Sequence, residues 1–268
     1  MRPMKIAWII AFLLVSLLLS TTAFAAIPPE YQQFVSTIPG VTEEMLYPDF
    51  WVNKPGQAKK VIMDAEEIAE YNSATAEAIG RVVELDDYPE SLTGEELTGM
   101  INLVSVRTSS MRYDINGNSL PADYWPAMTA QLNLSGVADV NPVRFGITVR
   151  RTNLRIFPTN EGLYSSRTNH DTDRLQWTAV YAEEPMAVLH ASADGQWYFA
   201  HIYTCFAWIP AEDVALAPKE VLFSYVNRDP FLVVTGDRVF TQPNPDTESV
   251  SEVQLDMGVR LPLPLPRR

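Results

Sequence analysis

The chain has 268 residues, with 33 Asp and Glu against 20 Lys and Arg, and a formal net charge of −13 at pH 7. This acidic balance argues against nucleic acid and against an anionic lipid surface as partners, because both attract clustered Lys and Arg. The single cysteine, Cys205, excludes an internal disulfide, so packing must stabilise the fold.

Residues 1–25 are predicted to be a signal peptide. Arg2 and Lys5 precede an apolar run over residues 6–19, and small residues follow it. The run is shorter than the roughly 20 apolar residues that a membrane-spanning helix needs, which disfavours the alternative of an uncleaved anchor. We expect cleavage before Ala26, which would make the protein periplasmic or secreted, without a stable membrane anchor.

Residues 26–141 are predicted to form a mostly helical domain. Five prolines interrupt residues 26–55, so this part is expected to be an extended arm whose aromatic side chains dock on other structure. Apolar residues recur at three- and four-residue spacing from about Ala58 to Ile79 and predict a helix that ends at Gly80.

Two further helices are expected in the same domain. Thr93 followed by Glu96 has the spacing of a capping box at a helix start. Trp125 and Met128 indicate another short helix. No set of residues in this domain suggests catalysis.

Residues 142–218 change to the pattern of a small β-barrel. Short β-branched or aromatic runs alternate with turn residues: "VRFGITVRRTNLRIFPT", "LQWTAVYA", "PMAVLHAS", "QWYFAHI" and "CFAWIP". The segment "PAEDVAL" after them predicts a closing helical turn. The fold class is therefore α+β and multidomain, with the helical domain first and the barrel second.

Residues 219–268 are predicted to begin a second β unit. "FLVVTGDRVF" predicts a strand pair with Gly236 and Asp237 as its turn. An incomplete unit would leave strand edges unpaired, which favours aggregation. Two arrangements would avoid this: the strand pair docks on the first barrel, or another chain completes the unit.

Several of these segments resemble the region that precedes the catalytic domain in exported NlpC-type cell-wall peptidases. "YNSATAEAIGRVVELDDYPESLTGEELTGMI" is similar to their helical stabilising domain, and "DTDRLQWTAVYAEEPMAVLHASADGQWYFAHIYTCFAWIPAEDVA" to their bacterial SH3 domain. The resemblance extends from about Trp51 to Leu263. It implies one complete SH3-like barrel over residues 142–218 and an incomplete second SH3-like domain over residues 219–268.

The resemblance also implies a role in peptidoglycan. The family's nucleophile is a cysteine in an Asp-Cys-Ser sequence, and this chain contains none. We therefore expect a non-enzymatic, exported region that recognises or targets peptidoglycan stem peptides or glycan, with a separate or lost catalytic domain as a further partner. Two alternatives stay open: a truncated copy of a γ-D-glutamyl-diamino acid cysteine endopeptidase, and a scaffold for envelope proteins.

Cys205 does not have the context of a nucleophile. A reactive thiol needs a helix N-terminus or a nearby imidazole that lowers its pKa. Cys205 lies in a short link between two β runs, where only His201 could approach it. The sequence favours a small apolar role for Cys205, so no catalytic residue is predicted.

No metal or cofactor is predicted either. "NHDTD" contains His170 with Asp171 and Asp173, but a zinc site needs three or four converging ligands. The two aspartates are expected to close a long loop through side-chain to backbone bonds. Glu183 and Glu184 are expected to be a solvated turn, and His190 a half-buried strand residue.

The barrel contains more aromatic residues than a core of its size needs. Alternation along "QWYFAHI" predicts that Trp197 and Phe199 point inward and Tyr198 outward. Exposed aromatic side chains bind peptides or sugars, and Arg155 could pair with a stem-peptide carboxylate. The candidate binding residues are Arg155, Tyr164, Trp177, Tyr198, Tyr203 and Trp208. In the alternative interpretation, these aromatic residues pack only against the helical arm or a further domain.

Overall fold

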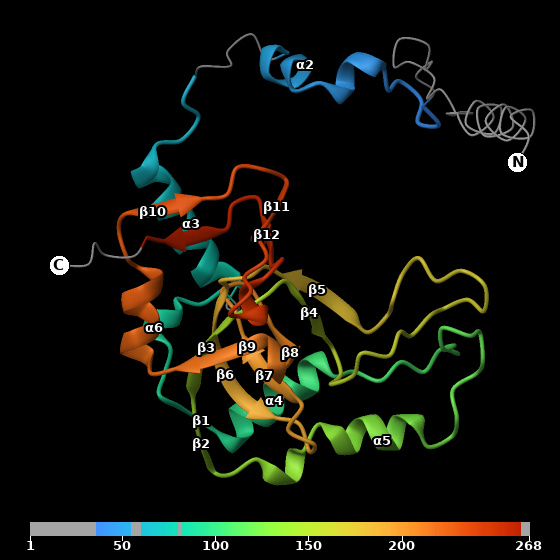
Figure 1. The fold of residues 1–268 in the computed structure, drawn as a ribbon. Coiled ribbons are helices and arrows are strands. Elements are labelled where there is room, and N and C mark those ends of the chain that lie inside the picture. Colours follow the sequence, from blue (N-terminus) through green and yellow to red (C-terminus); the bar gives the residue numbers. More distant parts are fainter. Residues whose placement is uncertain (1–35, 55–59, 80–81, 264–268) are drawn as a thin grey trace, which may run out of the picture. The chain divides into compact units, whose positions relative to one another are not determined.

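The computed structural model describes residues 36–54, 60–79 and 82–263 (Figure 1). The chain divides into two compact units, residues 1–67 and residues 68–268. The predicted signal peptide, the first part of the arm and Gly80 lie outside the described residues. Within the residues that are described, no helix is long and apolar enough to cross a bilayer.

The first unit contains a 3-10 turn, Glu43–Leu46, and the short helix α2, Pro48–Asn53. The Trp51 indole N–H donates to the Met45 carbonyl at 2.7 Å, which folds the segment back on itself. No side chain among residues 36–54 is buried. The docking of this arm therefore stays a prediction.

Helix α3 spans Ala65–Ile79 and begins later than the sequence predicted. The Asp64 carboxylate accepts the N–H groups of Glu66 and Glu67, both at 3.0 Å, and the Glu67 carboxylate accepts the N–H of Asp64 at 2.8 Å. This reciprocal capping fixes the helix start at Asp64. Val61 and Ile62, which were placed on the helix face, precede the helix and are exposed.

The other two predicted helices are confirmed. Helix α4, Gly94–Val104, has the expected capping box between Thr93 and Glu96, and its Leu97 and Ile101 are fully buried. Helix α5 spans Tyr124–Gln131. Strand β1 (Ser91–Thr93), which directly precedes α4, pairs with β2 (Val140–Pro142).

The predicted barrel is a curled seven-stranded antiparallel sheet in the order β5-β4-β8-β7-β6-β3-β9 (Figure 1). Its strands are β3 Arg144–Thr148, β4 Thr152–Arg155, β5 Gln176–Val180, β6 Pro185–Ala191, β7 Trp197–His201, β8 Phe206–Pro210 and β9 Val214–Ala217. A 3-10 turn, Ala211–Asp213, precedes β9, so the predicted closing turn is confirmed. The mixed helix and sheet fold class is confirmed as well.

One hydrophobic core crosses the predicted domain boundaries. Leu97 and Ile101 of α4 belong to the same buried cluster as Phe199 and Trp208 of the sheet. Helix α6, Lys219–Val226, follows β9 and adds the buried Leu222 to this cluster. The division at residues 141 and 218 stays a prediction, but the segments that it separates are packed together.

The strand pair predicted for "FLVVTGDRVF" is wrong. Strand β10, Phe231–Val233, pairs with β13, Arg260–Pro262, and β11, Arg238–Phe240, pairs with β12, Gln254–Asp256. Gly236 and Asp237 lie at a kink within this long two-stranded ribbon, residues 231–262. The chain does not reverse there because the Val234 backbone N–H donates to Val259 and its carbonyl accepts from Gly258.

The ribbon, which is not the strand pair predicted from the sequence, docks on the turn between β5 and β6. Leu255 and Val259 are buried against Ala182 of this turn. Arg151 forms an ion pair with Asp256, with 2.8 Å between Nη1 and Oδ1. All residues of β10 and β11 are exposed.

Candidate functional site

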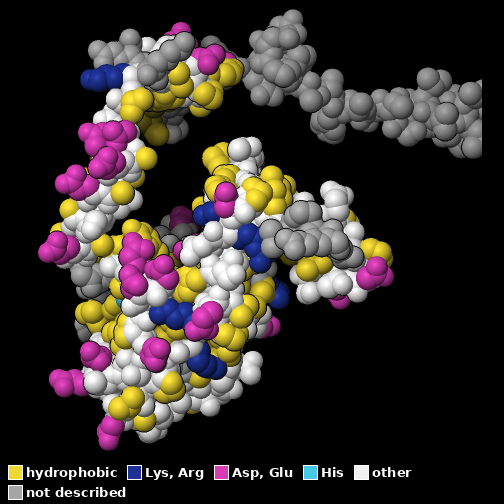
Figure 2. All heavy atoms as spheres, turned by 90° about the vertical axis from the view of Figure 1, so that its left-hand side faces the viewer, with side chains coloured by type: hydrophobic (Ala, Val, Ile, Leu, Met, Phe, Trp, Pro, Cys, Tyr) yellow, Lys and Arg dark blue, Asp and Glu magenta, His cyan; other side chains and the backbone are white. Residues whose placement is uncertain are grey.

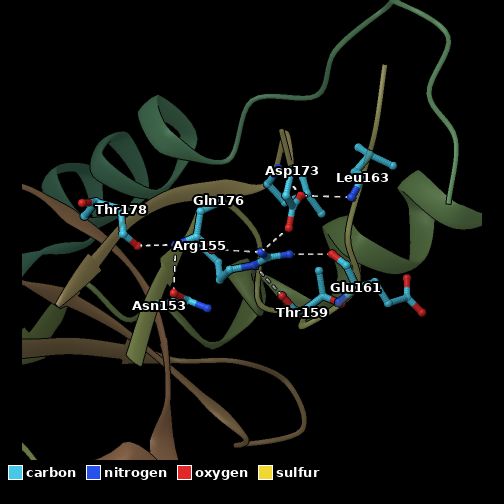
Figure 3. Close-up of polar contacts among 9 residues, drawn as sticks. Asn153, Arg155, Thr159, Glu161, Leu163, Asp173, Gln176 and Thr178 are labelled. Carbon is cyan, nitrogen blue, oxygen red and sulfur yellow. Dashed lines mark hydrogen bonds and ion pairs between the residues drawn. The ribbon is translucent and has the colours of Figure 1, made fainter. Parts of the chain in front are cut away.

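Arg155 occupies the end of β4 and is only 4% exposed (Figure 3). Its Nε donates to the Thr159 carbonyl at 2.9 Å, and Nη2 donates to the Glu161 carbonyl. Its Nη1 contacts the Asp173 carboxylate and donates to Gln176 Oε1 at 3.2 Å. The expectation that Arg155 faces a ligand is wrong. The guanidinium points into the protein, where it binds the loop between β4 and β5.

Asp173 completes this clamp on the loop between β4 and β5 (Figure 3). Its Oδ1 accepts the backbone N–H groups of Leu163 at 3.0 Å and Leu175 at 2.9 Å. The expected side-chain to backbone closure is therefore confirmed for Asp173. Asp171 accepts instead from the side chain of Asn169. Over the described ranges, no group of three or more His, Cys, Asp and Glu could hold a metal ion.

Two of the aromatic candidates are also buried. The Trp208 side chain on β8 is fully buried, and its indole N–H donates to Ser105 Oγ of the helical segment at 3.0 Å. Tyr164 exchanges backbone hydrogen bonds with Tyr113, and its ring lies 4.5 Å from that of His170. Both side chains contribute to packing, so neither offers a surface to a ligand.

Three candidates are accessible. Trp177 on β5 is 49% exposed, Tyr203 in the link between β7 and β8 is 37% exposed, and Tyr198 on β7 is half-buried. The predicted alternation is confirmed, because Trp197 and Phe199 are buried. Tyr198 lies under the Arg144 guanidinium at 5.0 Å from the ring centroid.

The Trp177 side chain contacts Cys205, and Tyr203 precedes Cys205 by two residues. Burial raises the pKa of the Cys205 thiol, and hydrogen bonds from the side chains of Thr204 and Trp177 oppose this increase. The nearby Glu184 charge raises the pKa further. The thiol is therefore protonated at neutral pH, which does not suit a nucleophile. We call the exposed surface formed by Trp177 and Tyr203 beside Cys205 the aromatic surface.

His201 contacts the helical segment and the sheet. Its Nδ1 lies 2.9 Å from the Tyr88 hydroxyl, and its ring packs edge-on against Tyr88 and Phe206. Burial, and secondarily the charge of Glu96, raise the pKa of Tyr88 to about 12. The hydrogen bond and the ring contact between Tyr88 and His201 join the helical segment to the sheet.

The Glu183–Glu184 pair is not the solvated turn that was expected. Glu183 accepts the Tyr225 hydroxyl at 2.7 Å, whereas Glu184 is half-buried and its backbone bonds to Thr148. Burial raises the pKa of Glu184. The two side chains have different surroundings, so they do not cooperate in acid–base chemistry. His190 is a half-buried strand residue as predicted, and its Nε2 lies 3.0 Å from the Asn133 carbonyl.

Sequence reasoning missed Arg144 and Tyr181. Tyr181 is exposed beside Arg151, whose guanidinium lies 5.5 Å from the ring centroid. The alternation of β3 places Arg144 on the face opposite to the buried Phe145, so the period-two pattern was a signal for it.

Comparison with known proteins first defines the class of domain. Residues 163–210 match the family described as SH3 domain (SH3b1 type). This range contains β5, β6, β7 and β8 and most of the loop that Arg155 clamps. The chain therefore contains a bacterial SH3 domain.

One solved structure then gives a wider likeness. It is an NlpC/P60 endopeptidase from Photobacterium damselae subsp. piscicida, with a TM-score of 0.57 and 18% sequence identity. The match covers 76% of this chain and 48% of that chain, so this chain spans about half of that structure. The likeness concerns the fold alone. No curated protein matches the sequence.

Proposed function

We propose that the chain is the exported, non-catalytic region of a cell-wall peptidase that recognises peptidoglycan. The fold is similar to that of an NlpC/P60 endopeptidase well beyond the SH3 domain itself. The ligand would be a stem peptide or its glycan, and the localisation periplasmic or secreted. The single observation that carries the binding role is the exposure of Trp177 and Tyr203 on the SH3-like barrel.

The aromatic surface has the properties of a ligand-binding patch. An indole and a phenol ring supply large apolar area and keep polar groups that can donate hydrogen bonds. The buried candidates stabilise the barrel instead: Trp208 fills the core, and Arg155 fixes the loop that leads into β5. Because Trp177 lies on strand β5, little ordering entropy would be lost when its ring binds.

Binding to purified sacculi tests the proposal. A Trp177→Ala, Tyr203→Ala double variant should lower the affinity at least tenfold, since exposed aromatic anchors contribute about 2 kcal/mol each to an interface. Tyr71→Ala removes an exposed aromatic residue of α3 and serves as the matched control. Equal binding of the wild type and the double variant would contradict the aromatic surface as the binding site.

The non-catalytic part of the proposal has its own test. The wild type and Cys205→Ala should both release no stem-peptide fragments from sacculi, as measured by mass spectrometry. The raised pKa of the thiol supports this expectation. Release of fragments by the wild type that is lost in Cys205→Ala would overturn it.

A further inference from the structure

A pocket of about 290 Å³ lies between residues 114–121 and residues 161–162 of the loop between β4 and β5. Both segments lie at the right-hand side of the view in Figure 1. Ile115, Leu120 and Pro121 give the pocket apolar walls. Ordinary ligand pockets have volumes of about 300–1,000 Å³, so this pocket suits a small ligand.

The Tyr124 side chain lines this pocket and carries a polar group without a partner. Tyr124 is the first residue of α5 and is 9% exposed. Its hydroxyl is buried and has no hydrogen-bond partner among the described residues. A buried hydroxyl in this state costs stability, and a phenol oxygen can both donate and accept. A ligand group in the pocket would supply the missing hydrogen bond.

The pocket differs in charge from the face of the molecule that Figure 2 shows. On that face, basic side chains are scattered among hydrophobic and acidic ones. The pocket is lined by the acidic residues Asp114 and Glu161, and no Lys or Arg is among the described residues that line it. The lining therefore attracts a cation and repels an anion.

Only one of the two carboxylates is left for a ligand. Asp114 closes its own turn by accepting three hydrogen bonds from Asn116 and Asn118. Arg167 donates to Ser119 Oγ at 3.3 Å, which brings one positive charge to the border of the pocket. The charges of Asp114 and Arg167 are opposite and offset each other, so Glu161 is the charge that a ligand would meet.

The Glu161 carboxylate is free and close enough to influence Tyr124. Glu161 binds Arg155 through its backbone carbonyl, and Figure 3 shows its carboxylate on the side away from the guanidinium. None of the ion pairs between described residues includes Glu161. Burial, and then the charge of Glu161, raise the pKa of Tyr124 to about 12, so the phenol is protonated at neutral pH.

We propose that this pocket binds a small ligand with a primary ammonium group on a short aliphatic chain. The ammonium has three N–H donors, so it would donate both to the Glu161 carboxylate and to the Tyr124 hydroxyl oxygen. The aliphatic chain would pack on Leu120 and Pro121. The site is separate from the aromatic surface and does not depend on peptidoglycan binding.

Titration of the isotope-labelled full chain with pentylamine at pH 7, followed by NMR, tests the proposal. Pentylammonium should shift the backbone amides of Glu161 and Gly162 saturably. The uncharged 1-pentanol should bind at least about tenfold more weakly, because hydrogen bonds between charged groups are the stronger ones. N-acetyl-lysine amide carries the same ammonium on a peptide unit. The tighter binder of the two amines shows whether the natural ligand is a free amine or an amine on a peptide.

Two variants test the residues that would hold the ammonium. Glu161→Gln and Tyr124→Phe should each weaken the binding of pentylammonium at least about fivefold. Glu212→Gln removes an exposed carboxylate elsewhere and should bind like the wild type. No saturable shift with either amine, equal binding of 1-pentanol, or equal binding by both variants would overturn the proposal.

Urea unfolding without ligand separates a ligand-binding hydroxyl from a structural one. Tyr124→Phe should leave the unfolding midpoint unchanged or raise it, because the hydroxyl that it removes has no partner. Tyr225→Phe removes a hydroxyl that donates to Glu183 at 2.7 Å, so it should lower the midpoint. A lower midpoint for Tyr124→Phe would show that a bound water already satisfies the hydroxyl, and would overturn the proposal.

Discussion

The barrel and the ribbon differ in burial although their strands have similar compositions. All five residues of β8, "FAWIP", are buried, whereas every residue of β10, "FLV", and of β11, "RVF", is exposed. The curled sheet surrounds one core and is covered by α4, while the ribbon has only two strands and buries side chains at one contact with the barrel. Hydrophobicity predicts a strand, but the number of packed layers decides how much that strand stabilises the fold.

The largest expected effect is a loss of stability on removing an aromatic side chain from the barrel, compared with the same change in the ribbon. Trp208→Ala should lower the free energy of unfolding by about 3–5 kcal/mol, because it leaves a cavity and an unpaired Ser105 hydroxyl. Phe240→Ala in the exposed ribbon strand should lower it by less than about 1 kcal/mol. Urea unfolding followed by circular dichroism measures both. Similar losses would show that the ribbon is as well packed as the barrel.

Variants of Arg155 test whether this residue stabilises the loop between β4 and β5 or binds a ligand. Arg155→Met should lower the free energy of unfolding by about 3 kcal/mol, because Asp173 would remain half-buried without its cation. Limited proteolysis should then cut the loop over residues 156–175 first. Arg155→Lys keeps the charge but loses the hydrogen bonds of the guanidinium, so it should have an intermediate stability. A fully stable Arg155→Met with weaker sacculus binding would instead favour a ligand-facing role.

Arg151 tests how the ribbon is held on the barrel. Arg151→Gln removes the ion pair with Asp256, and half-exposed pairs contribute about 1 kcal/mol or less. Hydrogen exchange of the ribbon amides should accelerate up to about fivefold, while β7 and β8 stay unchanged. Arg150→Gln, which removes the neighbouring ion pair with Asp213, is the matched control. Equal acceleration in the barrel would mean that ribbon and barrel unfold as one unit.

The smallest effect concerns Glu184 and depends on pH. Burial raises the pKa of Glu184, so the folded state favours the neutral acid and the charged form costs stability at pH 7. Glu184→Gln should therefore raise the free energy of unfolding at pH 7, and this gain should shrink as the pH falls toward 4. Glu212→Gln, at an exposed position, should show no such trend. A Glu184→Gln variant that is less stable at pH 7 would contradict the assigned cause.

Local patterns predicted most of the fold. Thr93 and Glu96 marked the start of α4, and alternation in "QWYFAHI" gave the correct inward residues of β7, because caps and strand faces depend on neighbouring residues. Long-range pairing was not predictable in this way. The turn at Gly236 and Asp237 failed because the partner strands of β10 and β11 lie further along the chain, at β13 and β12.

The candidate site was predicted only in part for the same reason. Residue type indicated Trp177 and Tyr203 as candidates, and both are exposed on the barrel. Arg155 was assigned to a ligand because its partners, Thr159, Glu161 and Asp173, come together only when the loop folds back. A buried role for Trp208 depends on the helical segment, whose Ser105 lies far from it in sequence.

The most direct test of the peptidoglycan proposal is an NMR titration of the isotope-labelled chain with soluble peptidoglycan fragments that retain their stem peptides. The account predicts chemical-shift changes at the Trp177 indole N–H and at the backbone amides of Tyr203 to Cys205. Saturable changes there, with those at the amides of Thr204 and Cys205 lost in the Trp177→Ala, Tyr203→Ala variant, would support the aromatic surface as the binding site. No change at these groups, at fragment concentrations that saturate binding to the whole chain, would contradict it.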